Sequence, residues 1–437
     1  MKIHFIGIGG IGISGLAQYM QYKGHQVSGS DIKDTLITKK LATLGIDITI
    51  PHSSSAIQDQ DLVVHSAIIR PDNPEIIAAK EKGIEVLARR EALLKILDDQ
   101  KVYAVAGAHG KSTTTAILAS IMDGSTIIGA ESKAFGSNVR YDEKSDVMIF
   151  EADESDGSFL NSNPYCAIVI NAEPEHMEYY DYNYERFYDS YKRFIKSAKC
   201  KVLNAEDPFL ATLTNEIEAE WLYPSKDIQD IEYVLIDNEP HTRFILRDLG
   251  SFEVWGFGKH IALDAALAIL AASDSMDIET IREKLLNFKG IKKRFDIVGL
   301  EDKSVIIDDY GHHPTEIKAT FESVKEYAHL KGFEKITAIW QPHKYSRTID
   351  NLDAFIECFK GADELIILPV WAASEAPQEI DFVEKFKAYN LTMADSIQRS
   401  SNTITIIKDQ KELEILDNGL IIGFGAGDIT YQIRGIH

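Results

Sequence analysis

"AGAHGKSTTT", residues 106–115, decides how most of this sequence is interpreted. Glycines followed by Lys-Ser before a Thr-rich helix start are typical of a loop that binds nucleotide phosphates, because bare backbone amides can approach the anion. The apolar run "KVYAVAG" leads into the loop, as the strand of such a motif should. Val105 stands where the standard eight-residue pattern has its first glycine, so the loop is a compressed variant.

This loop predicts a metal-assisted phosphate site. Lys111 would reach the β- and γ-phosphate oxygens, and the Ser112 hydroxyl would bind Mg²⁺, which also needs carboxylate ligands. Glu151 is the first acidic residue of "FEADESDGSF", and His176 follows a second apolar run in "INAEPEHMEYY". Both come where parallel strands should end, and open α/β sheets bind ligands at that edge. A solvated acidic turn and a structural histidine are the simpler alternatives.

A second glycine-rich loop lies in "HFIGIGGIG" near the N-terminus. Gly7, Gly9 and Gly12 match G-x-G-x-x-G between a strand-like and a helix-like run, which suits a pyrophosphate at a helix N-terminus. Asp31 ends the next strand-like run, where an acidic residue can meet a ribose hydroxyl. The pattern predicts a diphosphate-containing ligand, which could be NAD or a UDP-sugar. A tight turn without a ligand is the alternative.

The whole chain alternates short apolar runs with amphipathic ones, which predicts an α/β protein with parallel sheets and crossover helices. Three sets of such runs place domain boundaries near residues 98 and 298. The predicted domains are residues 1–98, 99–297 and 298–437. The strand-like runs include "HQVSGSD", "DLVVHSA", "CAIVINAEPEH", "SVIIDDYGHH", "KITAIWQPH", "TITIIKD" and "LIIGFGAGD".

Length and composition limit the class of protein. A chain of 437 residues is too long for one compact core. Its net charge of −22 argues against nucleic-acid binding, which needs a basic footprint. Its three cysteines form no CxxC pair, and no apolar run approaches the roughly 20 residues of a membrane span. These features predict a cytoplasmic protein that binds neither nucleic acid nor membrane.

The sequence resembles the Mur ligase family, the ATP-dependent enzymes that build the peptide stem of peptidoglycan. The resemblance covers essentially the whole chain, and its specificity comes from nine motifs in order. They are "GIGGIGISG", "SAIIRPDNPE", "GAHGKSTTT", "EADESDGSFL", "NAEPEHME", "KKRFD", "DDYGHHPTEI", "QPHKYSRT" and "GAGDI".

The resemblance implies three domains: an N-terminal Rossmann-like domain that binds UDP, a central P-loop ATPase domain and a C-terminal Rossmann-like domain that binds the amino acid. It implies the substrates UDP-N-acetylmuramate, L-alanine and ATP, a phosphoryl transfer that forms an acyl phosphate, and the use of two Mg²⁺ ions. A monomer or weak homodimer is expected.

The resemblance also implies roles for individual residues. Catalysis falls to Lys111, Glu151, His176 and Arg294, and metal binding to Ser112, Glu151 and His176. ATP would contact Gly107, Ala108, His109, Gly110, Lys111, Ser112, Thr113, His260, Arg294 and Asp309. The UDP-sugar would contact Gly9, Gly10, Ile11, Gly12, Asp31, Ser66 and Asn138. The amino acid would contact Tyr310, His312, Lys344 and Arg347. The alternatives are an interdomain salt bridge for Arg294 and helix capping for His312 and His313.

Some positions depart from the family pattern, and other functions compete. Lys344 replaces a usual arginine, and Ile261 and Asp264 replace asparagines that bind adenine in relatives. The closest rival is the recycling ligase that attaches a tripeptide to the same UDP-sugar. A folylpolyglutamate synthetase would lack the N-terminal domain. An NAD-dependent dehydrogenase or a non-catalytic nucleotide-binding scaffold would leave Lys111, Glu151 and His176 without a role.

Overall fold

The computed structural model describes residues 1–436, which form two compact units. The first unit contains Met1–Gln229, Ile245–Phe252 and Leu263–Lys289. The second contains Asp230–Phe244, Glu253–Ala262 and the chain from Gly290 onward. The boundary predicted near residue 98 falls inside the first unit. The boundary predicted near residue 298 comes shortly after Gly290, where the chain enters the second unit for the last time. The exact domain limits stay a prediction.

The N-terminal part of the first unit is a parallel five-stranded sheet in the order β3-β2-β1-β4-β5. The apolar runs predicted from the sequence form its strands. Their apolar side chains contribute to the core, in which Phe5 and Val64 are fully buried. The bounds are β1 (Lys2–Ile6), α1 (Ile11–Tyr22), β2 (Gln26–Ser30), α2 (Leu36–Thr43), β3 (Asp47–Thr49), η1 (Ser54–Ala56), β4 (Leu62–His65), α3 (Pro74–Glu81), β5 (Glu85–Ala88) and α4 (Arg89–Ile96).

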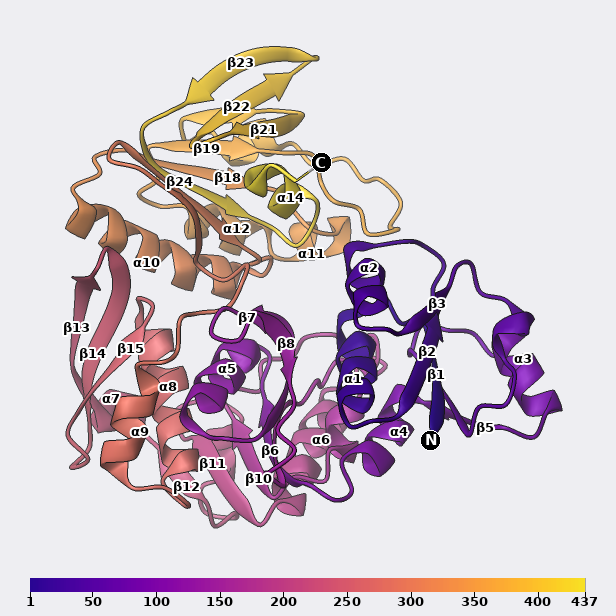
Figure 1. The fold of residues 1–437 in the computed structure, drawn as a ribbon. Helices are drawn as coiled ribbons and strands as arrows, with labels where there is room; N and C mark the ends of the chain where they lie inside the picture. Colours follow the sequence, from indigo (N-terminus) through magenta and orange to yellow (C-terminus); the bar gives the residue numbers. More distant parts are fainter. Residues whose placement is uncertain (437) are drawn as a thin grey trace. The chain divides into compact units, whose positions relative to one another are not determined.

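A seven-stranded sheet follows in the same unit, in the order β12-β11-β10-β6-β9-β7-β8. Strand β6 (Lys101–Ala106) lies between β9 (Val147–Glu151) and β10 (Cys166–Val169), and all three run parallel. Helix α5 (Lys111–Ile121) leaves the end of β6 and packs on β7 and β9 (Figure 1). The loop 106–111 therefore emerges between the acidic end of β9 and the segment that follows β10.

The remaining elements of this sheet include an antiparallel edge that the sequence did not indicate. Strands β7 and β8 form a hairpin, because β8 pairs antiparallel with β7. The bounds are β7 (Ser125–Ser132), β8 (Ser137–Arg140), η2 (Ser158–Asn161), α6 (Tyr184–Ser197), β11 (Cys200–Asn204), η3 (Leu210–Leu213), β12 (Glu220–Leu222), α7 (Pro224–Asp227) and α9 (Ile278–Leu285). The three-stranded sheet β13 (Ile228–Ile236), β14 (Glu239–Leu246), β15 (Ser251–Trp255) and helix α8 (Lys259–Ala272) contain residues of both units.

The second unit contains a six-stranded sheet in the order β16-β17-β24-β18-β19-β20, parallel except for the β16–β17 pair. The bounds are β16 (Asp296–Leu300), β17 (Ser304–Asp309), α10 (Pro314–Lys331), β18 (Ile336–Trp340), α11 (Tyr345–Asp350), α12 (Leu352–Cys358), β19 (Glu364–Ile367), α13 (Phe382–Lys385), β20 (Leu391–Met393), β24 (Gly419–Phe424) and α14 (Ile429–Arg434).

One predicted strand belongs to a different sheet. The run "TITIIKD" is β22 (Thr403–Lys408), which pairs antiparallel with β21 (Ser396–Ser400) and β23 (Lys411–Leu416) instead of joining the parallel sheet. The turn into β23 contains Asp409 and Gln410, both with positive φ, which is the geometry of a tight two-residue hairpin.

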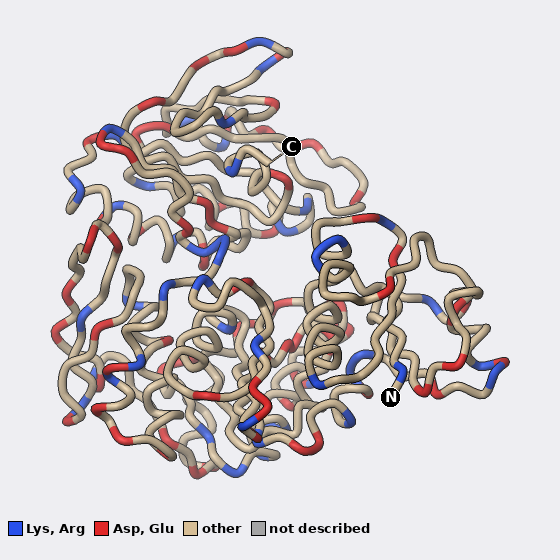
Figure 2. The backbone as a smooth tube through the Cα atoms, viewed as in Figure 1, with Lys and Arg blue, Asp and Glu red and all other residues tan. Residues whose placement is uncertain are grey.

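Charge is spread through the molecule. Within residues 1–436, acidic and basic side chains are interspersed along both units instead of being segregated into tails (Figure 2). Of the helices that the structure describes, none is both long and apolar enough to cross a bilayer.

Candidate functional site

The loop between β6 and α5 has the backbone geometry of a phosphate-binding loop. Gly107 and Gly110 have φ of +152° and +84°, values that disfavour any side chain. A Cβ atom on Gly107 would lie 3.3 Å from the backbone of Asn171, and one on Gly110 would lie 2.7 Å from the Asp264 carboxylate. Helix α5 begins at Lys111, so its unpaired N–H groups lie at the end of the loop. The loop can therefore accept an anion.

Asn171 fixes this loop, and the sequence did not indicate its role. The His109 amide donates to the Asn171 side-chain oxygen at 3.0 Å, and the Asn171 side-chain nitrogen donates to the His109 carbonyl at 3.0 Å. The two bonds tie the loop to the segment after β10. "NAEPEH" contains this asparagine, but no spacing rule assigns an asparagine there to a partner in the loop.

Lys111 lies among carboxylates at the start of α5. Its ammonium donates to the Gly107 carbonyl at 2.6 Å and lies 2.9 Å from a Glu154 oxygen. Burial alone would lower the pKa of Lys111, but the charges of Glu154, Asp153 and Glu151 outweigh burial and raise it. Lys111 is therefore charged at neutral pH, and its ammonium can exchange Glu154 for phosphate oxygen.

Ser112 and Glu151 come together, as predicted for metal ligands. The Ser112 hydroxyl lies near enough to Glu151 to lower the pKa of its carboxyl, and the Gly129 amide donates to Glu151 at 2.7 Å. Burial raises the pKa of Glu151 despite the nearby Lys111. The buried Glu151 carboxylate is costly to ionise without a nearby cation, and a bound Mg²⁺ would favour its charged form. The Ser112 hydroxyl and the Glu151 carboxylate are therefore a donor set that fits Mg²⁺.

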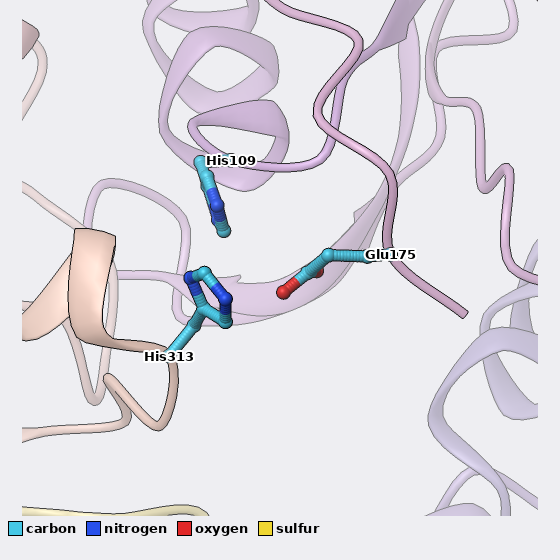
Figure 3. A group of neighbouring side chains, drawn as sticks. All are labelled: His109, Glu175 and His313. Carbon is cyan, nitrogen blue, oxygen red and sulfur yellow. The ribbon is translucent and has the colours of Figure 1, made fainter. Parts of the chain in front are cut away.

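His176 does not join these two residues. It lies on an exposed turn with φ of +52°, and among residues 1–436 no hydrogen bond or ion pair joins its imidazole to Ser112 or Glu151. His109 instead faces the acidic residues of this segment. Its imidazole lies 3.0 Å from a Glu173 oxygen and within 4.8 Å of a Glu175 oxygen, and Figure 3 shows His109 and Glu175 pointing toward one another. Figure 3 also labels His313, a residue of the second unit.

Two other predicted ATP contacts lie where the loop meets α5. Ala108 is buried within the loop, and Thr113 is half-buried in the first turn of the helix. Asp264, on α8, stands where relatives have an asparagine, and its carboxylate reaches Gly110. Ile261 is buried and packs toward Gly256. These two positions therefore belong to the loop's surroundings and the core, and they identify no adenine contact.

The N-terminal glycine loop brings together most of its predicted residues. The Gly9 amide donates to the Asp31 carboxylate at 2.8 Å, and Gly10 is the N-cap of α1, followed by the exposed Ile11. Ser66 follows β4, and its Cβ lies 3.2 Å from where a Cβ on Gly7 would be. Asp31 and Ser66 thus flank the loop at the carboxyl ends of β2 and β4.

Asn138, the remaining predicted sugar contact, lies elsewhere. It is buried in β8, where its side-chain oxygen accepts from the Gln18 amide of α1 at 3.0 Å. Its nitrogen lies 3.3 Å from where a Cβ on Gly15 would be. This contact joins α1 to the edge of the seven-stranded sheet, and the assignment of Asn138 to the sugar stays a prediction.

Arg89, which the sequence analysis did not single out, lies beside the glycine loop. A Cβ on Gly12 would meet its guanidinium at 2.8 Å, so the glycine leaves room for the cation. Arg89 donates to the Ser158 hydroxyl at 3.3 Å and lies 3.8 Å from the carboxylates of Asp153 and Asp156. In the part of the chain that the structure describes, its buried Nε has no hydrogen-bond partner. A cation with spare donors at this loop suits a diphosphate.

We expect Arg89→Met to raise the KM for the UDP-sugar about 10- to 100-fold, because a charged hydrogen bond contributes about 1.5–3 kcal/mol. The KM for ATP should change little. Arg90→Met is the matched control, because Arg90 is exposed on the same helix. Steady-state kinetics with each substrate varied separately would measure both constants, and equal rises for both substrates would contradict the assignment.

In the second unit, Arg294 lies among acidic and aromatic residues. It pairs with Glu316 at 2.8 Å, and the charges of Glu316 and Asp309 raise its pKa against the opposing effect of burial. Asp309 accepts from the amides of Phe295 and Gly311, each at 2.8 Å. Burial raises the pKa of Asp309 to about 6. Asp309 therefore holds the backbone around Arg294, and its contact with an ATP ribose stays a prediction.

His260 lies near enough to Arg294 for the arginine charge to affect its pKa. His260 lies in the first turn of α8, and burial, followed by the Arg294 charge, lowers the pKa of its imidazole to about 4. A neutral imidazole can accept a hydrogen bond and can stack on a base without adding charge. This is consistent with its predicted place near ATP.

Three of the four predicted amino-acid contacts gather around a histidine that the prediction omitted. His312 packs edge-on against Tyr310 and against His343, with ring centroids 5.5 Å apart in each pair. The Arg347 guanidinium lies 3.2 Å from His343 Nδ1, which must accept the hydrogen bond. The motif "QPHKYSRT" contains His343, but only the contact with His312 shows that it faces the same group.

Lys344 enters this group through its backbone. Its φ is +67°, and it is the N-cap of α11, which presents Arg347. The structure thus gives Lys344 a role in shaping the turn. His313 occupies the N-cap position of α10, and its backbone amide donates to Glu316 at 3.3 Å.

The neutral His343 predicts acid sensitivity. Burial, then the charges of Arg347 and Lys344, lowers its pKa to about 4, below the ordinary value of 6.5. As the pH falls, His343 therefore takes up a proton in the unfolded chain before it does so in the folded protein. We expect this histidine to reduce the free energy of unfolding by about 1–3 kcal/mol between pH 6.5 and 4. His343→Gln should flatten the pH dependence measured by denaturant unfolding, and an unchanged slope would contradict the shift.

Comparison with known proteins adds family evidence to this geometry. Three family models match: "Mur ligase family, catalytic domain" over residues 2–101, "Mur ligase middle domain" over 105–272, and "Mur ligase, glutamate ligase domain" over 293–427. Together they span most of the chain.

Two relatives that match nearly the whole chain carry the same name. A UDP-N-acetylmuramate–L-alanine ligase of Campylobacter curvus is 54% identical over 434 residues, 99% of each chain. A ligase of the same name from Helicobacter pylori is 52% identical over 437 residues, 99% of this chain and 96% of the other. The crystal structure of the UDP-N-acetylmuramate-alanine ligase of Thermotoga maritima matches with a TM-score of 0.81 at 26% identity, covering 99% of this chain and 97% of the other. A murein peptide ligase of Psychrobacter arcticus shares the fold, with a TM-score of 0.65 at 20% identity over 100% and 99% of the two chains.

Proposed function

The chain belongs to the Mur ligase family and has its three-domain α/β architecture, and we propose that it joins L-alanine to the lactyl carboxylate of UDP-N-acetylmuramate with conversion of ATP to ADP and phosphate. The observation that carries this proposal is full-length identity of 52–54% with relatives of that name. The product is a precursor of peptidoglycan. The charged Lys111 at a phosphate-binding loop provides independent support.

The loop serves the first chemical step, the activation of the carboxylate. A carboxylate is a poor electrophile because it is anionic and lacks a good leaving group, so its oxygen first takes the γ-phosphoryl group of ATP. Lys111 would stabilise the charge that develops on the transferring group. The backbone fixed by Asn171 would orient the phosphates. Mg²⁺ held by Ser112 and Glu151 would neutralise phosphate charge, and two ions are expected.

The second step forms the amide. The free amine of alanine attacks the acyl carbon, the tetrahedral intermediate collapses, and inorganic phosphate leaves. Arg347 would bind the alanine carboxylate through two parallel hydrogen bonds, and Tyr310 and His312 would line the space for the small side chain. Burial lowers the pKa of His312 to about 3, so this imidazole is neutral at neutral pH and adds no charge beside the carboxylate.

The first substrate would lie along the N-terminal glycine loop. The N-terminus of α1, together with Arg89, is suited to the diphosphate, and Asp31 and Ser66 lie where the nucleoside can be bound. None of these groups recognises nicotinamide. A dehydrogenase would also leave Lys111 and the Ser112–Glu151 pair without a role, so the ligase explains more of the structure.

Phosphate release tests the acceptor. The purified protein would be supplied with Mg·ATP, UDP-N-acetylmuramate and one acceptor at a time: L-alanine, glycine, L-serine or the tripeptide of the recycling ligase. We expect release with L-alanine and the matching gain in mass of the UDP-sugar. Release that depends on the tripeptide and not on alanine would overturn the proposal in favour of the recycling ligase.

The cellular setting follows from the substrates. ATP and a nucleotide-linked sugar are both cytoplasmic metabolites, so we place the reaction in the cytoplasm. A monomer or weak homodimer remains our expectation, and light scattering across a range of protein concentrations would measure it.

A further inference from the structure

Two of the three cysteines face each other on neighbouring strands of the first unit, far along the strands from the nucleotide loop. Cys166 and Cys200 are directly opposite each other in the parallel pairing of β10 with β11. Their sulfur atoms lie 2.8 Å apart, and both thiols are free. Each is the first residue of its strand, whereas the loop that binds nucleotide lies at the carboxyl end of β6.

The backbone at this pair meets the requirements of a disulfide. Adjacent strands lie about 4.8 Å apart, within the Cα separation of about 4.4–6.8 Å that disulfides span. The side chains of opposite residues in paired strands leave the sheet on the same face, and the sulfur–sulfur contact shows that these two point together. Closing the bond therefore needs side-chain rotation and no change of strand register.

The two thiols differ in exposure and in charge environment. Cys166 is fully buried, and Cys200 is half-buried. The hydrogen bond from Cys166 and the nearby ammonium groups of Lys201 and Lys101 lower the pKa of Cys200, while burial and Asp274 oppose them. The accessible sulfur is thus the one with more thiolate character, which is the combination that reacts with oxidants.

We propose that Cys166 and Cys200 form a reversible disulfide when the protein meets a peroxide. The Cys200 thiolate attacks one peroxide oxygen, the O–O bond breaks, and the departing hydroxide takes up a proton to become water. The resulting sulfenic acid is attacked by the Cys166 sulfur, which loses its proton as the S–S bond forms and a second water leaves. Two thiols lose two electrons in total, and the peroxide accepts both.

The Cys166–Cys200 disulfide would constrain a segment that contains part of the candidate site. Residues 166–200 would become a closed loop containing α6, Asn171, Glu173 and His176. The resolving thiol lies beside the attacking one, so a sulfenic acid at Cys200 would be captured before further oxidation. The pair would act as a reversible oxidation site, and a dithiol reductant would reopen it.

Mass spectrometry of the intact full-length protein tests the proposal. After brief treatment with hydrogen peroxide, we expect a loss of two hydrogen atoms, a peptide joining Cys166 to Cys200, and full reversal by dithiothreitol. Cys358→Ser is the matched control and should behave like the wild type, because Cys358 is buried elsewhere and burial raises its pKa to about 12.

Cys166→Ser should instead accumulate sulfenic or sulfinic acid at Cys200, and Cys200→Ser should be unreactive. Phenylarsine oxide, which needs two neighbouring thiols, should bind the reduced wild type and neither of these variants. Stepwise addition of oxygen to Cys200 in the wild type, or a disulfide that includes Cys358, would overturn the proposal. These outcomes do not depend on which substrates the enzyme uses.

Discussion

Lys111→Ala is expected to lower kcat by about three to four orders of magnitude. Its ammonium is the one cation placed by the structure on the loop 106–111, at 2.6 Å from the Gly107 carbonyl. The protein takes little covalent part in phosphoryl transfer. A preorganised positive charge that contacts the transferring group therefore supplies several kcal/mol of transition-state stabilisation. Single-turnover measurement of acyl-phosphate formation or ADP release would determine the loss.

The substitution should leave UDP-sugar affinity within about threefold, because Arg89 and the first glycine loop are unchanged. Calorimetric titration with UDP-N-acetylmuramate measures that affinity directly. Lys144→Ala, at an exposed position of the same unit, is the matched control for loss of a positive charge. A Lys111→Ala enzyme with near-normal turnover would contradict the assignment of this loop to ATP.

Removing Lys111 also leaves its ion-pair partner Glu154 without a cation, which gives a second observable. Glu154 is buried, and burial and Asp153 raise its pKa while Lys111 lowers it. Without the ammonium, Glu154 should take up a proton at a higher pH than in the wild type. The variant should therefore fold and lose catalysis, which separates the kinetic effect from a failure to fold.

The two glycine loops and the main sheets could be predicted because their signals are local. A glycine pattern directly after an apolar run specifies a strand, a turn and a helix start, and the structure confirms β1 with α1 and β6 with α5. Glu151, the acidic residue at the end of β9, lies near Ser112 because neighbouring parallel strands end at the same edge, and its role as a metal ligand stays a prediction.

The partners of the loops could not be predicted, because they depend on contacts between distant segments. Asn171 holds the loop from 62 positions along the chain, and Arg89 reaches Ser158 across 69. An asparagine or arginine in a strand-end segment carries no pattern that identifies such a partner. His176 shows the reverse case, since its motif marked the correct segment while the structure directs His109 toward the acidic residues there.

The β7–β8 hairpin and the antiparallel sheet β21–β22–β23 were missed for a different reason. Strand β22 alternates apolar and polar residues, and that alternation fits an antiparallel strand as well as the edge of a parallel sheet. The turn at Asp409 and Gln410 allows β22 to pair antiparallel with β23. Both residues have positive φ there, which the sequence alone did not indicate. Ile261 and Asp264 depart from the family pattern, and the sequence does not say what they contact. The structure places Ile261 near Gly256 and Asp264 near Gly110.

Arg347→Ala is expected to raise the KM for L-alanine about 100-fold or more, while the KM values for ATP and UDP-N-acetylmuramate change little. Loss of two charge-assisted hydrogen bonds to one carboxylate removes about 3 kcal/mol or more of binding. The structure holds Arg347 in place through neutral His343, at 3.2 Å, so the guanidinium fork is already oriented.

Arg347→Lys separates geometry from charge. A lysine keeps the charge but makes single, freely rotating hydrogen bonds, so the KM for alanine should fall between the wild-type and alanine-variant values. Arg243→Lys, at a surface position of the same unit, is the matched control. Initial rates with alanine varied against saturating ATP and UDP-sugar would measure these differences. If Arg347→Lys instead matches the wild type, a planar clamp is not what selects the amino acid, and charge alone suffices at this position.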